Sequence, residues 1–247
     1  MTVLQGGVPA FGIMGAMAEE IRLIRDDLDD PRPVPGPIDV TFGWLDGIPV
    51  LLARSGIGKV NATLSAAAMA AAGAASIVFT GVAGAVARGL DIGDMVIGDR
   101  FIQHDADGTA FGDPIGQVPG EPECWLPDAE LTGRVLDAGR RVDPGGRRVV
   151  TGTIASGDQF IADPGKVAWL RDRFDASAVE MEGAALAQAA SHLRVPFAVA
   201  RILSDSADGQ AASDFPAFLA RAAELDRRLA HELVAGLHES PDRRLTP

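Results

Sequence analysis

The segment FGIMGAMAEEIRLIRDDL, residues 11–28, indicates the fold class because it joins a short apolar run directly to a longer helical pattern. Phe11 to Met14 has the length of a strand, whereas Met17 to Leu28 repeats apolar residues at helical spacing. The same alternation continues along the chain, which is typical of strands joined by crossover helices. The sequence therefore predicts an α/β fold.

Further elements follow from the same patterns. Short apolar runs, several of them β-branched, predict strands at residues 40–45, 50–53, 77–80, 95–98, 149–154, 176–179 and 197–203. Amphipathic or Ala-rich stretches predict helices at residues 60–72, 128–142, 164–174, 181–193 and 216–237. Asp46-Gly47 predicts a hairpin turn, and the four prolines between residues 31 and 37 predict another turn.

The 247 residues show no linker or abrupt change of composition, so a single domain over residues 1–247 is expected. Its ordered core should span about residues 11–237, and the polar residues 239–247 should form a flexible tail. Residues 105–127 are rich in Gly and Pro and too long for an ordinary connection. Because Phe111 and Trp125 have no evident place inside the chain, this segment is expected to be exposed, either as a functional loop or as a subunit contact.

Composition excludes several classes of partner. The formal net charge is −12, with no basic cluster, so neither nucleic acid nor an anionic membrane surface is an expected partner. Cys124 is the single cysteine, which excludes an internal disulfide, and the four histidines lack zinc-ligand spacing. No metal or cofactor is therefore expected. The N-terminal residues lack the features of a signal peptide, which favours a cytoplasmic protein.

Acidic residues follow several of the predicted strands, where ligands collect in open α/β sheets. Three pairs meet this criterion: Glu19 with Glu20, Glu180 with Glu182, and Asp205 with Asp208. Each pair also has a structural explanation, as partners of a helix dipole, as buried paired acids, or as a cap or turn. Together they predict a pocket lined with carboxylates, which suits a transition state that develops positive charge.

Glycine-rich segments and one aromatic residue leave alternatives open. The turn TGVAGAV, residues 80–86, allows the backbone to approach a ligand closely, although packing alone would also explain its glycines. SGIGKVNA, residues 55–62, is a weak phosphate motif because it matches neither the Walker loop nor the dinucleotide pattern. Phe160, in SGDQF, either packs in the core or stacks on a planar base.

Taken together, the motifs resemble those of the 5′-methylthioadenosine/S-adenosylhomocysteine nucleosidases of the nucleoside phosphorylase superfamily. The resemblance covers about residues 12–237 and is carried by GIMGAMAEEI, SGIGKVNA, TGVAGAV, GDMVIGD, QHDADGTAFG, ASGDQFI, AVEMEGAA and ARILSDSADG. It implies a three-layer α/β/α fold around a mixed, partly barrel-like sheet, assembled as a homodimer. The implied activity is hydrolysis of the N-ribosidic bond of 5′-substituted adenosines, which releases adenine.

The resemblance also implies roles for individual residues. Glu20 matches the glutamate that activates the attacking water, and Arg201 lies where the family helps to hold that water. Asp205 matches the general acid that protonates N7 of adenine. Met181 and Glu182 match the ribose-binding pair.

The remaining implied contacts surround the base and the 5′ substituent. Phe160 is similar to the adenine-stacking ring, and the Ile161 backbone is similar to a partner of the base edge. The other substrate-binding positions are Ile57, Val82, Ser204 and Phe215, together with Phe111 and Pro119 from the neighbouring subunit. This chain departs from many members at Val82, where they have serine, and at Asp113, where they have an aromatic residue.

Three alternatives compete with this interpretation. A nucleoside phosphorylase would need positive partners for phosphate, but Phe79 and Thr80 precede Gly81, and Glu20 would repel the anion. An aminofutalosine hydrolase of menaquinone synthesis would share the reaction and differ in the 5′ substituent. A non-catalytic nucleoside sensor would not need Glu20 and Asp205 together.

Overall fold

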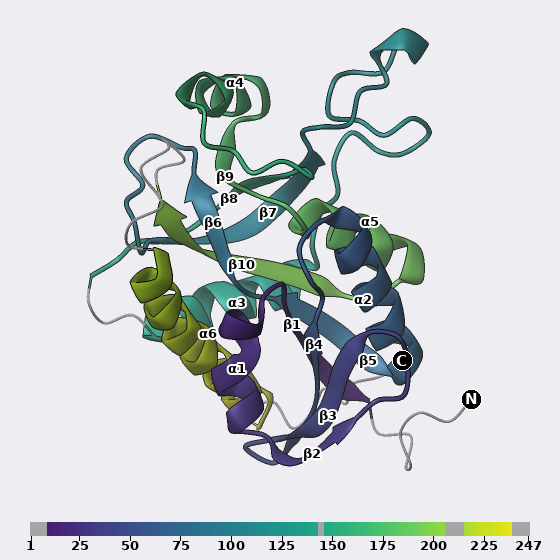
Figure 1. Cartoon of the computed structure of the whole chain (residues 1–247), viewed down its shortest axis with the longest axis vertical. Coiled ribbons are helices and arrows are strands. Elements are labelled where there is room, and N and C mark those ends of the chain that lie inside the picture. The colour runs from purple at the N-terminus through teal and green to yellow at the C-terminus, as the bar shows by residue number, and fades with distance from the viewer. Residues whose placement is uncertain (1–8, 143–145, 206–214, 239–247) are drawn as a thin grey trace.

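In the computed structural model, which describes residues 9–142, 146–205 and 215–238, ten strands form one mixed sheet with helices on both faces (Figure 1). The strands are β1 (Ala10–Gly15), β2 (Asp29–Pro33), β3 (Asp39–Leu45), β4 (Ile48–Arg54), β5 (Ala74–Phe79), β6 (Val82–Ala85), β7 (Met95–Gln103), β8 (Val149–Ser156), β9 (Ala176–Glu180) and β10 (Phe197–Asp205). The helices are α1 (Ala18–Asp26), α2 (Lys59–Ala72), α3 (Ala129–Val142), α4 (Pro164–Phe174), α5 (Gly183–Leu193) and α6 (Phe215–His238), with a 3₁₀ turn η1 (Thr109–Phe111).

The sheet is open at one end and closed at the other. Its strand order is β2-β3-β4-β1-β5-β10-β6-β9-β8-β7, and β10 also pairs with β7 in antiparallel orientation. This additional pairing closes β10, β6, β9, β8 and β7 into a barrel. The predicted three-layer fold with a partly barrel-like sheet is confirmed.

Two core clusters cover the two faces of the sheet. Successive side chains of β1 alternate between them, as strand geometry requires: Phe11 and Ile13 belong to the cluster of α1, α3 and α6, whereas Met14 belongs to that of α2 and α5. Figure 1 shows α1 and α6 side by side on one face. No helix within the described ranges is long and apolar enough to cross a membrane.

The hairpin prediction is confirmed, and so is a turn in the proline-rich segment, where residues 34–38 join β2 to the antiparallel β3. The turn predicted at TGVAGAV is wrong. Asp46 and Gly47 both have positive φ, 48° and 78°, and they join the paired strands β3 and β4. The proline-rich segment after α1 contains β2, an exposed edge strand, where prolines are tolerated because one side of the strand needs no hydrogen bonds. The glycine turn TGVAGAV contains β6, which pairs with β9 and β10.

The expectation that both aromatic residues of segment 105–127 are exposed is wrong for Trp125. Trp125 is 4% exposed and forms an antiparallel bridge with Phe101, in which each backbone N–H donates to the other residue's carbonyl at 3.0 Å. The returning chain thus adds a rung beside β7 and buries the indole in the core. Phe111, on η1, is 81% exposed, as expected, and η1 projects away from the sheet in Figure 1.

Replacement of the buried indole should therefore be costly. Trp125→Ala is expected to lower the free energy of unfolding by about 3–5 kcal/mol, because it leaves a large cavity in the core. The matched control is Trp44→Ala on β3, whose side chain is 37% exposed, and this change should cost clearly less. Urea unfolding of both variants measures the difference. Equal losses would show that Trp125 does not contribute to the core.

Candidate active site

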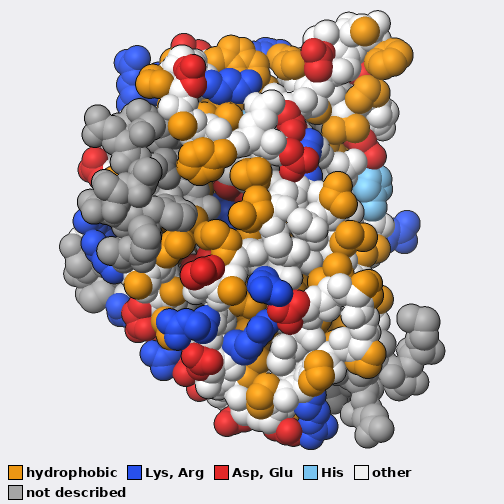
Figure 2. Space-filling model, in the orientation of Figure 1, with side chains coloured by type: hydrophobic (Ala, Val, Ile, Leu, Met, Phe, Trp, Pro, Cys, Tyr) orange, Lys and Arg blue, Asp and Glu red, His pale blue; other side chains and the backbone are white. Residues whose placement is uncertain are grey.

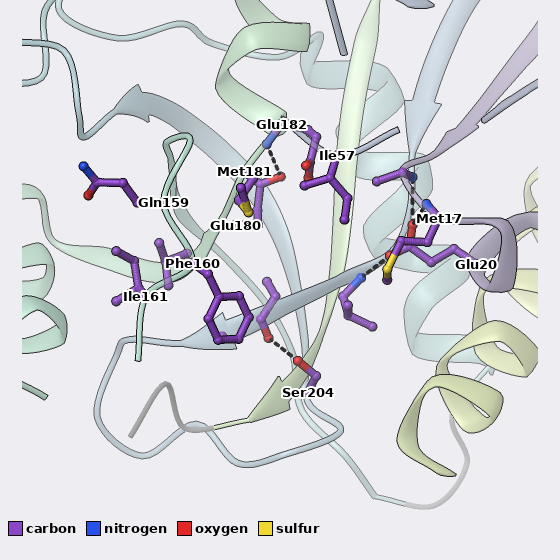
Figure 3. A pocket seen from close by; sticks show the side chains of 15 residues that line it. Met17, Glu20, Ile57, Gln159, Phe160, Ile161, Glu180, Met181, Glu182 and Ser204 are labelled. Atoms are coloured by element: carbon purple, nitrogen blue, oxygen red, sulfur yellow. Dashed lines mark hydrogen bonds between the residues drawn. The ribbon is translucent and has the colours of Figure 1, made fainter. Parts of the chain in front are cut away.

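A pocket lies at the ends of the central strands, as expected for an open α/β sheet (Figure 3). It is lined by segments that follow β1, β4 and β8 and by residues of β6, β9 and β10. The lining residues are Ala16, Met17, Glu20, Ile57, Val82, Ala83, Gly84, Gln159, Phe160, Ile161, Val179, Glu180, Met181, Glu182 and Ser204. The structure thus brings together most of the side chains that the sequence singled out.

Glu20 is a buried carboxylate at the wall of this pocket. Its side chain is 3% exposed, and Oε2 accepts hydrogen bonds from the N–H groups of Ala16 at 2.7 Å and Met17 at 2.9 Å. Oε1 accepts from Val82 N–H at 3.0 Å. Burial raises the pKa of Glu20, while Arg201 and the three N–H donors oppose this rise. One side chain therefore stabilises the start of α1 and also lines the pocket.

Gly81 makes this arrangement of Glu20 possible. Its φ is +149°, and a Cβ at this position would lie 2.4 Å from Oε1 of Glu20 and 2.9 Å from Nη1 of Arg201. Both distances are too short for non-bonded atoms, so any larger residue would push the carboxylate or the guanidinium away. Gly81 thus allows the backbone to lie close to the side chains of Glu20 and Arg201. This is a more specific role than packing alone.

Arg201 and Glu180 form a fully buried ion pair beneath the pocket. Arg201 is 1% exposed, and its Nη2 and Nε donate to Oε2 of Glu180 at 2.6 and 3.2 Å. The guanidinium also lies over the ring of Phe79, 4.0 Å from its centroid. Glu180 additionally accepts hydrogen bonds from Ser156 Oγ and from the N–H groups of Glu182 and Gly183. Its carboxylate is therefore occupied by the protein itself.

Glu182 differs from Glu180 in having fewer internal partners. Its Oε1 accepts from Gly58 N–H at 2.7 Å, and its Oε2 lies 3.8 Å from Nη2 of Arg201. Burial first, and then repulsion from Glu180, raise the pKa of Glu182 well above that of an ordinary glutamate. Three buried acids thus share one guanidinium, and this excess of acid favours retention of a proton on Glu182.

Phe160 lies on the opposite side of the pocket from Glu20 in Figure 3. Its side chain is 71% exposed, so the core alternative is wrong and the ring is available for a flat ligand. Ile161 follows it at the same wall, while Ile57, 54% exposed, lies near Met17 toward the other end. The pocket therefore has an aromatic end at Phe160 and an aliphatic end at Met17 and Ile57, and Glu20 lies beside Met17 at the aliphatic end.

The acid assigned to leaving-group protonation is described only in part. Asp205 ends β10 directly after Ser204, which lines the pocket, but its side chain lies outside the described residues. Asp208 also lies outside them, and of Phe215 only its position at the start of α6 is described.

The two residues expected from a neighbouring subunit do not line the pocket of their own chain. Phe111 and Pro119 are both exposed in segment 105–127. Neither is among the pocket-lining residues, so a role in this site requires a second copy of the chain.

A further buried acid, Asp226 of α6, was missed by sequence reasoning. Its side chain is 1% exposed, and Oδ1 accepts a hydrogen bond from Thr80 Oγ1 in the segment that contacts Glu20. Within the described residues, Oδ2 has no hydrogen-bond partner. A signal existed in the sequence, because Asp226 falls at helical spacing between the buried residues Ala222 and Leu229.

The state of Asp226 should make stability depend on pH. Burial raises its pKa well above the ordinary carboxyl value, so the folded protein holds a proton that the unfolded chain releases. Stability is therefore lost as pH rises from about 4 toward neutrality. Asp226→Asn cannot ionise, so this variant should be more stable than the wild type at neutral pH, with a difference that shrinks on acidification. Urea unfolding across this range measures it, and a difference independent of pH would contradict the assignment.

The model of the phosphorylase superfamily matches residues 10–235. The chain is 38% identical over 232 residues to a 5′-methylthioadenosine/S-adenosylhomocysteine nucleosidase of Geobacillus sp. (strain WCH70), which covers 93% of this chain and 99% of that protein. Two solved structures superpose closely. The nucleosidase of Neisseria meningitidis in complex with methylthio-immucillin-A gives a TM-score of 0.87 at 38% identity, over 93% of this chain and 100% of that one. A futalosine hydrolase of Helicobacter pylori gives 0.86 at 33% identity, over 94% and 100%. This chain therefore belongs to the phosphorylase superfamily and, within it, to the family of 5′-methylthioadenosine/S-adenosylhomocysteine nucleosidases.

Proposed function

We propose that the protein hydrolyses the N-ribosidic bond of 5′-methylthioadenosine, S-adenosylhomocysteine and related 5′-substituted adenosines, and that it releases adenine. The observation that carries the proposal is Glu20, a buried carboxylate held by three N–H groups at the wall of a pocket whose far end presents the exposed ring of Phe160. A fixed acid facing a stacking surface fits a nucleoside whose ribose becomes positively charged. The named relatives support the substrate class.

The reaction separates charge, and the acids of the pocket can stabilise both parts. Breaking the bond leaves positive charge on the ribose and negative charge on the departing base. Glu20, as a carboxylate, accepts a proton from the attacking water and favours the cation electrostatically. Its raised pKa makes it a stronger base, because the pKa of an efficient general base lies near the working pH.

Ribose and base are positioned by separate groups. Glu182, with Met181 beside it, holds the ribose hydroxyls, which fixes the reacting carbon relative to the water on Glu20. Phe160 stacks on adenine, and the backbone of Ile161 pairs with the base edge. Asp205 donates a proton to N7, which requires that its environment raise its pKa so that the acid form is present.

The valine at position 82 is compatible with this mechanism. The resemblance implies a serine there in many members, and Val82 cannot supply its hydroxyl. The backbone N–H of Val82 nevertheless donates to Oε1 of Glu20 at 3.0 Å, which fixes the carboxylate without a side chain. Arg201 contributes through its charge, because it offsets part of the negative potential on Glu20.

Two of the alternatives are disfavoured by the charges at the site. None of the described residues that line the pocket is Lys, Arg or His, and the nearby Arg201 is already bonded to Glu180, so a phosphate nucleophile finds no cation. A sensor without catalysis would have no use for a buried carboxylate opposite the stacking ring. Aminofutalosine hydrolysis remains the second candidate, because a futalosine hydrolase is among the closely superposing structures.

The proposed reaction predicts its products. The protein should release free adenine from 5′-methylthioadenosine in phosphate-free buffer, with free 5-methylthioribose as the second product. Chromatography of the products, with and without added phosphate, distinguishes hydrolysis from phosphorolysis. A sugar 1-phosphate as the main product, or strict dependence on phosphate, would overturn the proposal.

Substitutions of Glu20 and Asp205 test the separate roles of these two acids in proton transfer. Asp205→Asn and Glu20→Gln keep the side-chain shape but not the proton chemistry, so each should lower kcat by roughly 10²-fold or more. Glu20→Gln should still bind the nucleoside, because ground-state binding depends little on the water. Asp26→Asn, at an exposed acid of α1, is the matched control and should retain wild-type turnover. Wild-type kcat in either active-site variant would remove that residue from the mechanism.

We also propose that the protein acts as a homodimer in which segment 105–127 completes the neighbour's pocket. Phe111 is 81% exposed in its own chain, where it does not contribute to the pocket. The rim near Ile57 continues onto α2 through Val60 and Leu64, which share one helix face and are 69% and 50% exposed. These apolar surfaces would be buried by a second copy, and Phe111 would then cover the 5′ end of the substrate.

Removal of this ring should weaken substrate use without unfolding the chain. Phe111→Ala is expected to lower kcat/KM for 5′-methylthioadenosine about tenfold, which corresponds to about 1.4 kcal/mol of lost transition-state binding. Ile92→Ala, another exposed apolar position outside the segment, serves as the control. Light scattering under assay conditions gives the oligomeric state. A fully active monomer would contradict the dimer.

A further inference from the structure

A second cavity, the groove, joins the pocket at its aliphatic end. The two share Ala16, Met17 and Ile57, so they adjoin at these residues. Asn61 supports the shared wall, because its Nδ2 donates to the carbonyl of Ile57 at 2.6 Å. From this wall the groove extends to Asp39 and Arg54.

The proposed orientation of the nucleoside directs its 5′ substituent into this groove. If the base lies on Phe160 and Glu182 holds the ribose hydroxyls, the carbon that bears the 5′ group faces away from Phe160 (Figure 3). Met17 and Ile57 are the side chains at that end. A methylthio group would end at this aliphatic wall, whereas a longer substituent would pass it and enter the groove.

The outer part of the groove combines both signs of charge. Asp39 lies between two arginines: its Oδ2 is 3.1 Å from Nε of Arg54, and its Oδ1 is 3.1 Å from Nη2 of Arg25. Among the residues that the structure describes, the two terminal nitrogens of Arg54 make no hydrogen bond or ion pair, and its side chain is 47% exposed. Figure 2 shows basic and acidic side chains side by side over α1 and the neighbouring strands.

Glu19 supplies an acid at the near side of the same groove. It is exposed in the first turn of α1 and lines the groove, whereas its neighbour Glu20 points inward to the pocket. Arg54 and Glu19 thus offer one cation and one anion in the lining of the same groove. This pairing of charges matches a zwitterion better than a single anion or a neutral tail.

We propose that this groove binds the amino-acid end of a 5′ substituent, with the Arg54 guanidinium on the carboxylate and Glu19 on the ammonium group. The assignment rests on the proposed nucleosidase function and specifies its substrate class. Nucleosides with a homocysteinyl tail use the groove, and those with a methylthio group leave it empty. Arg54 and Glu19 are therefore specificity-determining residues that lie away from the bond that breaks.

The test compares adenine release from S-adenosylhomocysteine and 5′-methylthioadenosine. Arg54→Met keeps the aliphatic stem and removes the charge, so kcat/KM for S-adenosylhomocysteine should fall about tenfold, as for loss of one partly exposed charge-assisted hydrogen bond. The value for 5′-methylthioadenosine should stay within about twofold, because that substrate has no group in the groove. Arg54→Lys should recover part of the loss. Arg22→Met, at an exposed arginine of α1 outside the groove, is the matched control.

A second comparison identifies which group of the tail is bound. The decarboxylated analogue of S-adenosylhomocysteine keeps the ammonium, so Arg54→Met should leave its kcat/KM unchanged while Glu19→Gln lowers it. Aminofutalosine carries a carboxylate without that ammonium. A larger effect of Arg54→Met on aminofutalosine than on S-adenosylhomocysteine would overturn the amino-acid assignment.

The remaining outcomes are distinct from one another. Equal losses for S-adenosylhomocysteine and 5′-methylthioadenosine in Arg54→Met, or no loss for either, would overturn the groove assignment while the nucleosidase function stands. If the wild-type protein released adenine from neither substrate, the proposed function would fail, and the groove assignment with it.

Discussion

The buried ion pair between Arg201 and Glu180 is the interaction on which the site depends. The side chain of Arg201 is 1% exposed, so its guanidinium needs a close anionic partner. Glu180, the last residue of β9, provides it, with Oε2 2.6 Å from Nη2 of Arg201. The sheet order places β9 and β10 on either side of β6, so the pair spans the strand that carries Val82. With the guanidinium engaged by Glu180, the pKa values of Glu20 and Glu182 are raised, chiefly by burial, so these two acids are disposed to take up protons or to form hydrogen bonds with hydroxyl groups.

Most of the fold was predictable because most of its elements have strong local patterns. The hairpin at Asp46-Gly47 and the Ala-rich helix α2 follow from turn chemistry and composition. β2 was missed because its prolines suit an edge strand as well as a turn, and β6 was missed because its glycines conceal a strand of four residues. Trp125 was misplaced for a different reason. Its bridge to Phe101 joins residues that are distant in sequence, and no local pattern reports such a contact.

The site was predictable where residue type and strand position agree. Glu20 and Glu182 were found because acids at strand ends are unusual, and the structure adds that Glu20 serves both of the roles considered for it, as a helix-start acceptor and as a pocket wall. The division between Glu180 and Glu182 was not predictable, because it depends on which carboxylate the Arg201 side chain reaches. Asp226 escaped notice because a lone acid in a helix is usually solvent-exposed, and only its position on the buried stripe of α6 distinguishes it.

Strand β10 links the two parts of the sheet and restricts how they can move. It pairs with β5 through residues 197–199 and then with β6 and β7 from residue 200 onward, so it belongs to the open sheet and to the closed barrel. A hinge between these parts would have to break backbone hydrogen bonds of a strand whose residues Phe197 to Leu203 are all buried. Rigid-body opening between the open sheet and the barrel would therefore have a high free-energy cost. Exchange of substrate and product would instead depend on segments outside the sheet.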